Sequence, residues 1–322
     1  MKFKWKKLGR VFDPTTSEFK RNWIMEYAQA PATLIFDDFI RVYFSCRPEP
    51  DENGQYVSYS GFLDLDRSNL FNILRVSDEP ILKLGELGTF DEFGTYPVSV
   101  IRHSGLYRAY YAGWSRCDSV PYNTAIGIAE SEDSETFKKL GNGPILSYSL
   151  TEPMTISGPK IRHFEGKYYL FYVAGERWIR GVNKPESVFK IKMAISDDGI
   201  NWSKVNRNII EYKLNENECQ ASPDVIFFEG KYHMFFSYKH AYNFRDNNRG
   251  YRIGYACSAN LVDWERNDEN AGIEISRHSA FDDQSMAYPH VFELDGKVFM
   301  LYLGNSVGKY GFGLAELTNY SI

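Results

Sequence analysis

The sequence predicts an all-β protein, a five-bladed β-propeller, and two observations carry this prediction. The first is a hairpin phrase that occurs five times, with successive copies 66, 62, 64 and 66 residues apart. A fixed period of this kind indicates one structural unit stacked several times. The second is the high content of Tyr and Phe, 23 of each, which favour strands over helices. Each copy is marked by one proline: Pro31, Pro97, Pro159, Pro223 and Pro289.

Each copy reads as four short strands. In the fourth copy, SPDVIFF leads into the turn Glu229-Gly230, and KYHMFFSYKH returns as the second strand. A third strand follows, YRIGYACS at 251–258, and then a turn, SANLVDW, that opens a fourth strand. Four strands joined by tight turns predict one antiparallel sheet for each copy. The strands are apolar on both faces, as expected for sheets that pack against a neighbour on either side of a ring.

The two ends of the chain are predicted to close the ring. The fifth copy ends after its third strand, YGFGLAEL at 310–317, and so lacks a fourth. Residues 5–9, WKKLG, closely match FKKLG at 137–141, the expected outer strand of the second blade. We therefore expect the N-terminal strand to complete the last blade, with residues 1–322 forming one propeller domain. A sandwich of five hairpins is the alternative, which the regular repeat disfavours.

Composition and charge argue against nucleic acid and membrane partners. The net charge of −5 and the pI near 5.8 give no basic footprint, so we expect no nucleic acid partner. No apolar run is long enough to span a membrane, and no signal peptide follows the basic N-terminus, so we expect no membrane partner and a cytoplasmic protein. The four cysteines lack a paired or metal-binding spacing and are expected to be free thiols. The oligomeric state stays open.

No metal or other cofactor is predicted. The chain has no Gly-rich phosphate loop, no nucleophile elbow and no paired-Cys zinc motif. His290 follows Pro289 directly and could face the channel. A lone histidine is more often a core residue with satisfied hydrogen bonds than a metal ligand.

Acidic residues precede the prolines at related positions. Five residues before them stand Glu26, Glu92, Met154, Glu218 and Gln284, and neighbouring acids are Asp91, Asp282 and Asp283. Because inner strands converge on the axis of a propeller, we expect these residues to ring one mouth of the channel. Carboxylates held together raise one another's pKa, so that an acid and a carboxylate coexist, as glycoside cleavage requires. The alternative is that they are solvated turn residues.

The sequence-based hypothesis assigns Glu218 as general acid and Glu92 or Glu26 as base or nucleophile. Asp91, Asp282, Asp283 and Gln284 would bind substrate or tune these groups. Aromatic and basic residues near the hairpin ends would hold the sugar: Trp114, Arg116, Arg177, His240 and Arg245. Aromatic faces stack on sugar rings, and Arg or His bind hydroxyls and anions. Blade-to-blade packing is the alternative for the aromatic residues.

With its hairpin phrase and its SxDGxxW turn at 196–202, the whole chain resembles the five-bladed propeller glycosidase-like superfamily, which includes glycoside hydrolase families 32, 43, 62, 68 and 130. Segments such as ECQASPDV, YPHVFELDGK and YGFGLAEL resemble a bacterial branch often encoded with surface-polysaccharide genes. The resemblance implies a propeller fold and a carbohydrate ligand.

The catalytic acids of families 32 and 43 are not in their usual places. The corresponding positions carry Ala30, Tyr96 and Ser157. Three hypotheses therefore remain: a glycoside hydrolase-like enzyme with relocated acids, a non-catalytic carbohydrate-binding propeller, and a phosphorylase or sugar transferase. In the third, Arg177, Arg180 and Arg245 could hold phosphate or a nucleotide-sugar. A retaining or an inverting outcome depends on the separation of the carboxylates, which the sequence leaves open.

Overall fold

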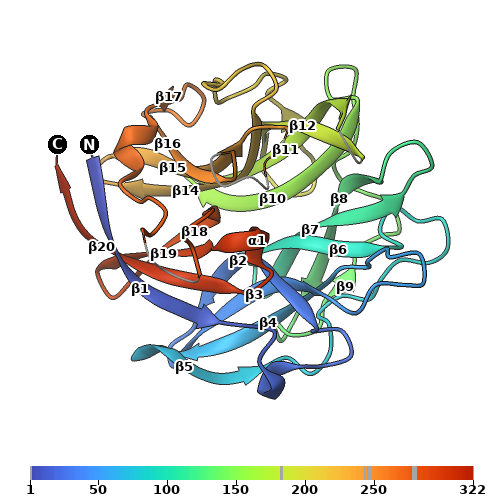
Figure 1. Ribbon diagram of the computed structural model, residues 1–322, viewed down its shortest axis with the longest axis horizontal. Helices are drawn as coiled ribbons and strands as arrows, with labels where there is room; N and C mark the ends of the chain where they lie inside the picture. Colours follow the sequence, from blue (N-terminus) through green and yellow to red (C-terminus); the bar gives the residue numbers. More distant parts are fainter. Residues whose placement is uncertain (1, 182–183, 243, 245–248, 278–280, 322) are drawn as a thin grey trace.

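Five four-stranded antiparallel sheets stand in a ring in the computed structural model (Figure 1), which confirms the predicted five-bladed β-propeller. The structure describes residues 2–181, 184–242, 244, 249–277 and 281–321. Each of the first four blades uses four consecutive strands, ordered from the axis outward. All four cysteines are free thiols, as predicted. Within the described residues, no helix is both long enough and apolar enough to cross a membrane.

The strand bounds follow the repeat. Blade one contains β2 (Glu26–Ile35), β3 (Phe39–Arg47), β4 (Tyr59–Asp66) and β5 (Asn69–Val76). Blade two contains β6 (Gly94–His103), β7 (Leu106–Arg116), β8 (Tyr122–Ser131) and β9 (Lys138–Lys139). Blade three contains β10 (Met154–Phe164), β11 (Lys167–Arg180), β12 (Pro185–Ser196) and β13 (Ser203–Lys204). Blade four contains β14 (Cys219–Phe228), β15 (Lys231–Lys239), β16 (Arg252–Ser258) and β17 (Glu265–Arg266).

The last blade is closed by the N-terminal strand, as predicted. It contains β18 (Ala287–Leu294), β19 (Lys297–Leu303), β20 (Phe312–Ser321) and β1 (Lys2–Phe12). β1 pairs with β20 in antiparallel register, and the two ends of the chain lie side by side in Figure 1. Helical elements are short and connect strands: η1 (Ser17–Phe19), η2 (Asp268–Ala271) and α1 (Asn305–Gly308).

Apolar side chains fill the spaces between blades. Phe12 on β1, Phe44 on β3 and Phe312 on β20 are buried, and the ring centroid of Phe12 lies 5.0 Å from that of Phe44 and 5.7 Å from that of Phe312. The core between the first two blades similarly joins Tyr43 to Val98. Strands covered on both faces explain why the sequence lacks a clean polar–apolar alternation.

Every inner strand carries the same irregularity at its proline. In each blade, two residues of the inner strand lie opposite one residue of the second strand, which is a β-bulge. The bulged pairs are Ala30-Pro31, Tyr96-Pro97, Gly158-Pro159, Ser222-Pro223 and Tyr288-Pro289. Proline fits here because a bulge interrupts the hydrogen-bond ladder in which it cannot donate. The repeated proline of the sequence therefore marks a repeated bend near the axis.

We expect ring closure to depend on Lys7. Its ammonium lies 2.6 Å from a carboxylate oxygen of Asp282, whose side chain is 3% exposed. Lys7→Met leaves that buried carboxylate without its cation, and the loss of one partner should lower the free energy of unfolding by roughly 3 kcal/mol. Urea denaturation followed by tryptophan fluorescence measures the change. The matched control is Lys6→Met, because Lys6 is exposed on the same strand; equal stability losses in both variants would contradict this role.

Candidate functional site

A pocket of about 760 Å³ opens at one mouth of the propeller and is lined by residues from all five blades. Its lining includes residues at all five bulges: Ala30, Tyr96, Gly158, Ser222 and Tyr288. Ala30, Ser222 and Tyr288 adopt left-handed φ angles of 49°, 48° and 52°. Non-glycine residues rarely take this conformation, and where they do it often marks a functional site. The bulges thus bring five separate points of the chain to one pocket.

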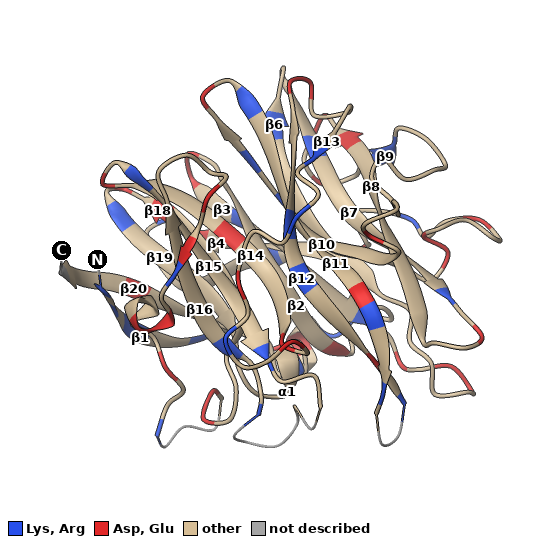
Figure 2. Ribbon diagram, turned by 90° about the horizontal axis from the view of Figure 1, so that it is seen from above, with Lys and Arg blue, Asp and Glu red and all other residues tan. Residues whose placement is uncertain are grey.

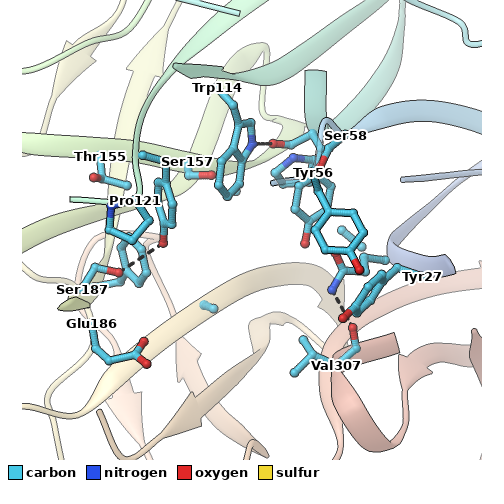
Figure 3. A pocket seen from close by; sticks show the side chains of 18 of the residues that line it. Tyr27, Tyr56, Ser58, Trp114, Pro121, Thr155, Ser157, Glu186, Ser187 and Val307 are labelled. Carbon is cyan, nitrogen blue, oxygen red and sulfur yellow. Dashed lines mark hydrogen bonds between the residues drawn. The ribbon is translucent and has the colours of Figure 1, made fainter. Parts of the chain in front are cut away.

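Aromatic side chains wall this pocket. The ring of Tyr122 lies 4.4 Å from that of Trp114 and 5.3 Å from that of Trp178, measured between centroids. Trp114 Nε1 donates a hydrogen bond of 2.5 Å to the Tyr96 carbonyl oxygen, which fixes the indole. Tyr27 and Tyr56 lie on another side of the pocket (Figure 3). Walls of this kind suit the apolar faces of sugar rings.

Three tyrosines, Tyr96, Tyr251 and Tyr288, line the pocket, and the ring centroid of Tyr251 lies 5.8 Å from that of Tyr288. Burial raises the pKa of Tyr96, Tyr251 and Tyr288 above the usual value. These phenols therefore stay protonated at neutral pH and offer hydroxyl groups, not charges, to a ligand.

The pocket is rich in cations. Among the described residues that line it, the cations are Arg47, Arg116, Lys184, Lys239 and Lys309, and the single carboxylate is that of Glu186. Glu186 lies near the start of β12, next to Ser187, and faces the pocket across from Tyr27 and Tyr56 (Figure 3). The Ser187 hydroxyl lies 3.3 Å from the Tyr122 hydroxyl. A ring of carboxylates, expected from the sequence, is not found among these residues.

Glu218, the predicted general acid, lies inside blade four and does not line the pocket. Its side chain is fully buried, 2.6 Å from Arg266 Nη1, and it accepts hydrogen bonds from the backbone N–H groups of Lys213 and Leu214. Burial alone would raise the pKa of Glu218, but the Arg266 guanidinium and the hydrogen bonds to the carboxylate lower it overall. A carboxylate held ionised in this way is a poor proton donor. The contacts of Glu218 are those of a structural ion pair.

The same ion pair recurs in three other blades, where an acid before the inner strand meets a lysine of the outermost strand. Asp91 lies 2.6 Å from Lys139, and Glu152 lies 2.5 Å from Lys204. The third pair is Lys7–Asp282, described above. Tyrosine hydroxyls of the second strands also donate to these acids, as Tyr111 does to Asp91 at 2.8 Å. Among the predicted site acids, these pairs account for Glu218, Asp91 and Asp282, whereas Glu26 and Glu92, which share the register of Glu218, take no part in them. Figure 2 shows charged segments within the strands as well as in the loops.

Trp114, Arg116 and Gln284 are the predicted site residues that line the pocket. Glu26 lies beside it, since it accepts a hydrogen bond from the Tyr56 hydroxyl and pairs with Lys309. Among the described residues, the remaining predicted ones are not in the lining: Glu92, Asp91, Asp282, Asp283, Arg177, His240 and Glu218. Arg245 lies outside the described residues.

The residues off the pocket have other contacts. Glu92 accepts a hydrogen bond from the Gly88 N–H, and Asp283 accepts one from the Asn305 amide. Arg177 donates to Asn217 at 2.7 Å. Burial lowers the pKa of His240. None of these contacts brings the residue to the sugar-sized space at the mouth.

Sequence reasoning did not single out Arg47, Tyr27, Tyr56, Tyr122 and Glu186 as site residues. Arg47 ends a second strand, Tyr122 and Glu186 lie at the starts of third strands, Tyr56 lies in the connection between β3 and β4, and Tyr27 lies at the start of the inner strand β2, so no common spacing from the prolines marks them. The family comparison offered one usable indication. It identified Ala30, Tyr96 and Ser157 as the usual acid positions, and all three line the pocket.

Behind the bulges, a buried ionic cluster joins four inner strands at the axis. His290 Nδ1 lies 2.7 Å from Asp224 Oδ2, and the Thr33 backbone N–H donates to His290 Nε2 at 2.8 Å. Because Nε2 accepts, the proton of the neutral imidazole sits on Nδ1 and is donated to Asp224. Lys160 donates to the Pro31 carbonyl oxygen at 3.1 Å, and Arg162 pairs with Asp224.

The charges in this cluster shift the pKa values of its own members. Burial raises the pKa of Asp224, but the charges of Arg162 and Lys160 and the hydrogen bond from His290 outweigh it and hold that pKa far below its usual value. Burial lowers the pKa of Lys160 to about 8, and burial and Lys160 lower that of His290 to about 4. Across the described residues, no group of three or more His, Cys, Asp or Glu side chains is placed to hold a metal ion.

The chain is 33% identical over 316 residues to an uncharacterized protein of Mycobacterium tuberculosis, found in strains CDC 1551 and H37Rv. The match covers 98% of this chain and 99% of the mycobacterial protein. The chain belongs to the family of that protein. No model of a known protein family matches this member.

Several solved structures have a fold similar to that of this protein. A structure named as a complex of BT0996 with RGII has a TM-score of 0.75 at 17% identity, and the match covers 99% of this protein and 94% of BT0996. One named as a glycoside hydrolase has a TM-score of 0.74 at 17% identity with the same coverage. A member of family 130, described with mannoside phosphorylases and β-1,2-mannoside hydrolases, has a TM-score of 0.68 at 15% identity and covers 98% and 94%. The family thus has the fold of the glycoside hydrolase-like propeller superfamily, as the resemblance implied.

We expect His290 to make stability fall in mild acid. Its pKa is about 4 when folded and about 6.5 when unfolded, so below pH 6.5 the unfolded chain takes up a proton that the folded one refuses. Its contribution is complete above pH 6.5, and about 2 kcal/mol of it is lost between pH 7 and pH 5. Urea denaturation at both pH values measures the slope.

His290→Gln should flatten the slope by that amount. His163→Gln is the control, because His163 is exposed near the end of β10, and it should leave the slope unchanged. Identical slopes in wild type and His290→Gln would contradict the neutral, Asp224-bound imidazole.

Proposed function

We propose that the protein is a glycan-active enzyme that acts on a glycosidic bond bound in the axial pocket. The observation that carries this proposal is an aromatic-walled pocket at the propeller mouth, into which one carboxylate projects opposite the tyrosine side (Figure 3). Its volume of about 760 Å³ falls within the range of small-ligand sites. The fold shared with glycoside hydrolases supports the proposal by analogy.

In this proposal, some residues of the pocket bind the sugar and others take part in the chemistry. Trp114, Tyr122 and Trp178 stack against sugar rings, and the protonated hydroxyls of Tyr96 and Tyr288 donate hydrogen bonds to sugar oxygens. Glu186 exchanges the proton with the glycosidic oxygen, because it is the carboxylate that lines the described pocket. Glu26, beside Tyr56 and Lys309, is the second carboxylate within reach of the mouth. Hydrolysis would use it to orient water.

Phosphorolysis or glycosyl transfer is a second candidate. One lining carboxylate beside five cations favours it, because an incoming phosphate brings its own nucleophile and needs only one acid from the protein. A carbohydrate-binding propeller without catalysis is the third candidate, supported by Ala30, Tyr96 and Ser157 at the usual acid positions. The three candidates share the pocket and differ in whether turnover occurs and in what it requires.

A substrate screen distinguishes the three candidates. Wild-type protein is incubated with aryl glycosides and polysaccharide fragments, with and without phosphate, and released sugar is measured. We expect release of free sugar; release only with phosphate, as a sugar phosphate, would move the protein to the phosphorylases. Saturable binding with no turnover of any substrate would overturn the enzyme proposal.

Glu186→Gln is expected to reduce kcat roughly 100-fold or more, because the amide cannot exchange the catalytic proton. The contrasting variant is Glu218→Gln, which leaves Arg266 without its buried counter-charge. It should lower the urea midpoint but keep kcat per folded molecule within a few-fold of wild type. The reverse pattern, an active Glu186→Gln and an inactive, folded Glu218→Gln, would return the chemistry to Glu218.

A further inference from the structure

The cations of the pocket come one from each blade. Arg47 ends β3, Arg116 ends β7 and Lys239 ends β15, while Lys184 precedes β12 and Lys309 follows α1. The protein as a whole carries a net charge of −5, so this arrangement is not a consequence of a basic surface. Like charges gathered at one concave mouth repel one another and focus a positive potential there. This repulsion would be relieved by a ligand that carries negative charge.

Contacts with other side chains fix the positions of three of the lining cations. Arg116 lies 3.0 Å from Asp51, and Lys309 lies 3.1 Å from Glu26. Lys239 is 7% exposed and lies over the ring of Phe244, 3.1 Å from its centroid.

Arg47 differs from the others. Its guanidinium lies 4.6 Å from the ring centroid of Tyr27 and 5.3 Å from that of Tyr56, so two aromatic faces hold it in position. Within the described part of the chain its side chain has no ion pair or hydrogen bond, and its Nε atom is buried without a partner. A buried donor left in this way costs free energy unless a ligand accepts from it.

The surroundings of Arg47 are suited to an oxyanion. Arg47, Tyr96 and Tyr288 line the same pocket. The protonated hydroxyls of the two tyrosines are donors, and a guanidinium fork matches the geometry of carboxylate, sulfate or phosphate. Together these groups form a positively charged donor set at the pocket.

We infer that the pocket recognises an acidic glycan, with one anionic substituent of a sugar (carboxylate, sulfate or phosphate) bound by Arg47. This inference rests on the proposed function, because it takes a glycan as the ligand. A glycan that carries its charges along a chain fits the observations better than a single ion, since the cations are spread over five blades. Arg47 sets the position of one charged sugar, and the remaining cations attract the others.

The test measures binding with defined probes. A glycan array with neutral, uronate-containing, sulfated and phosphorylated oligosaccharides is screened with the whole protein. Calorimetry then compares the best acidic binder with its carboxyl-reduced or desulfated form, and with inorganic phosphate. We expect the acidic form to bind, the neutralised form to bind roughly 10- to 100-fold more weakly, and Arg47→Gln to lose a similar factor.

The matched control is Arg102→Gln. Arg102 also lies over two aromatic rings, Phe36 and Tyr107, but it stands at the far end of β6 and does not line the pocket. It should bind the acidic probe as wild type does. Because the comparison of charged and neutralised probes uses wild-type protein alone, the test holds even if Arg47→Gln folds poorly.

Each remaining outcome has one meaning. Equal binding of charged and neutral glycans would overturn the acidic-glycan inference and leave the proposed function standing. Binding of inorganic phosphate alone at Arg47, with glycans bound regardless of charge, would assign the anion site to free phosphate and also overturn the inference. No binding or turnover of any glycan would overturn the proposed function itself.

Discussion

The bulge at the start of every inner strand is the constraint on which the pocket depends. It places two residues opposite one and bends the strand, so that the residue before each proline leaves the sheet ladder. Left-handed φ at Ala30, Ser222 and Tyr288 costs about 1–2 kcal/mol each, which the packing on both faces of the blades must offset. A regular strand would avoid that cost, but it would keep those side chains in the blade interfaces and close the mouth.

The fold was predictable because it rests on features that repeat. The proline period, the strand lengths and the similarity of WKKLG to FKKLG each reflect a contact made in several blades. The last similarity now has a physical cause, since Lys7 and Lys139 both pair with a buried acid of their own blade. A sequence pattern that recurs in every blade therefore indicates residues that stabilise each blade.

The same reasoning explains why the shared register of the acids is weak evidence for catalysis. Glu218, Asp91 and Asp282 precede the prolines at related positions because each supplies a counter-charge for the outermost strand of its blade. A residue with the role proposed for Glu186 or Arg47 needs to occur only once, and so it leaves no repeat in the sequence. Trp114 and Arg116 were identified because strand ends with polar neighbours are unusual in themselves. Arg47 has the same kind of position but no exposed aromatic beside it in sequence.

The positive charge at the mouth of the propeller depends on the residues at the positions where families 32 and 43 carry acids. Tyr96 stands where the resemblance to families 32 and 43 implies a carboxylate, and burial raises the pKa of its phenol, so Tyr96 adds no negative charge to the pocket. In the buried cluster at the axis, the Asp224 carboxylate already pairs with Arg162 and accepts a hydrogen bond from His290. Among the described residues that line the mouth, five lysines and arginines stand beside one carboxylate, that of Glu186, and favour a positive potential. An acidic protein thus presents a positive pocket, and a ligand that enters it gains most by bringing negative charge.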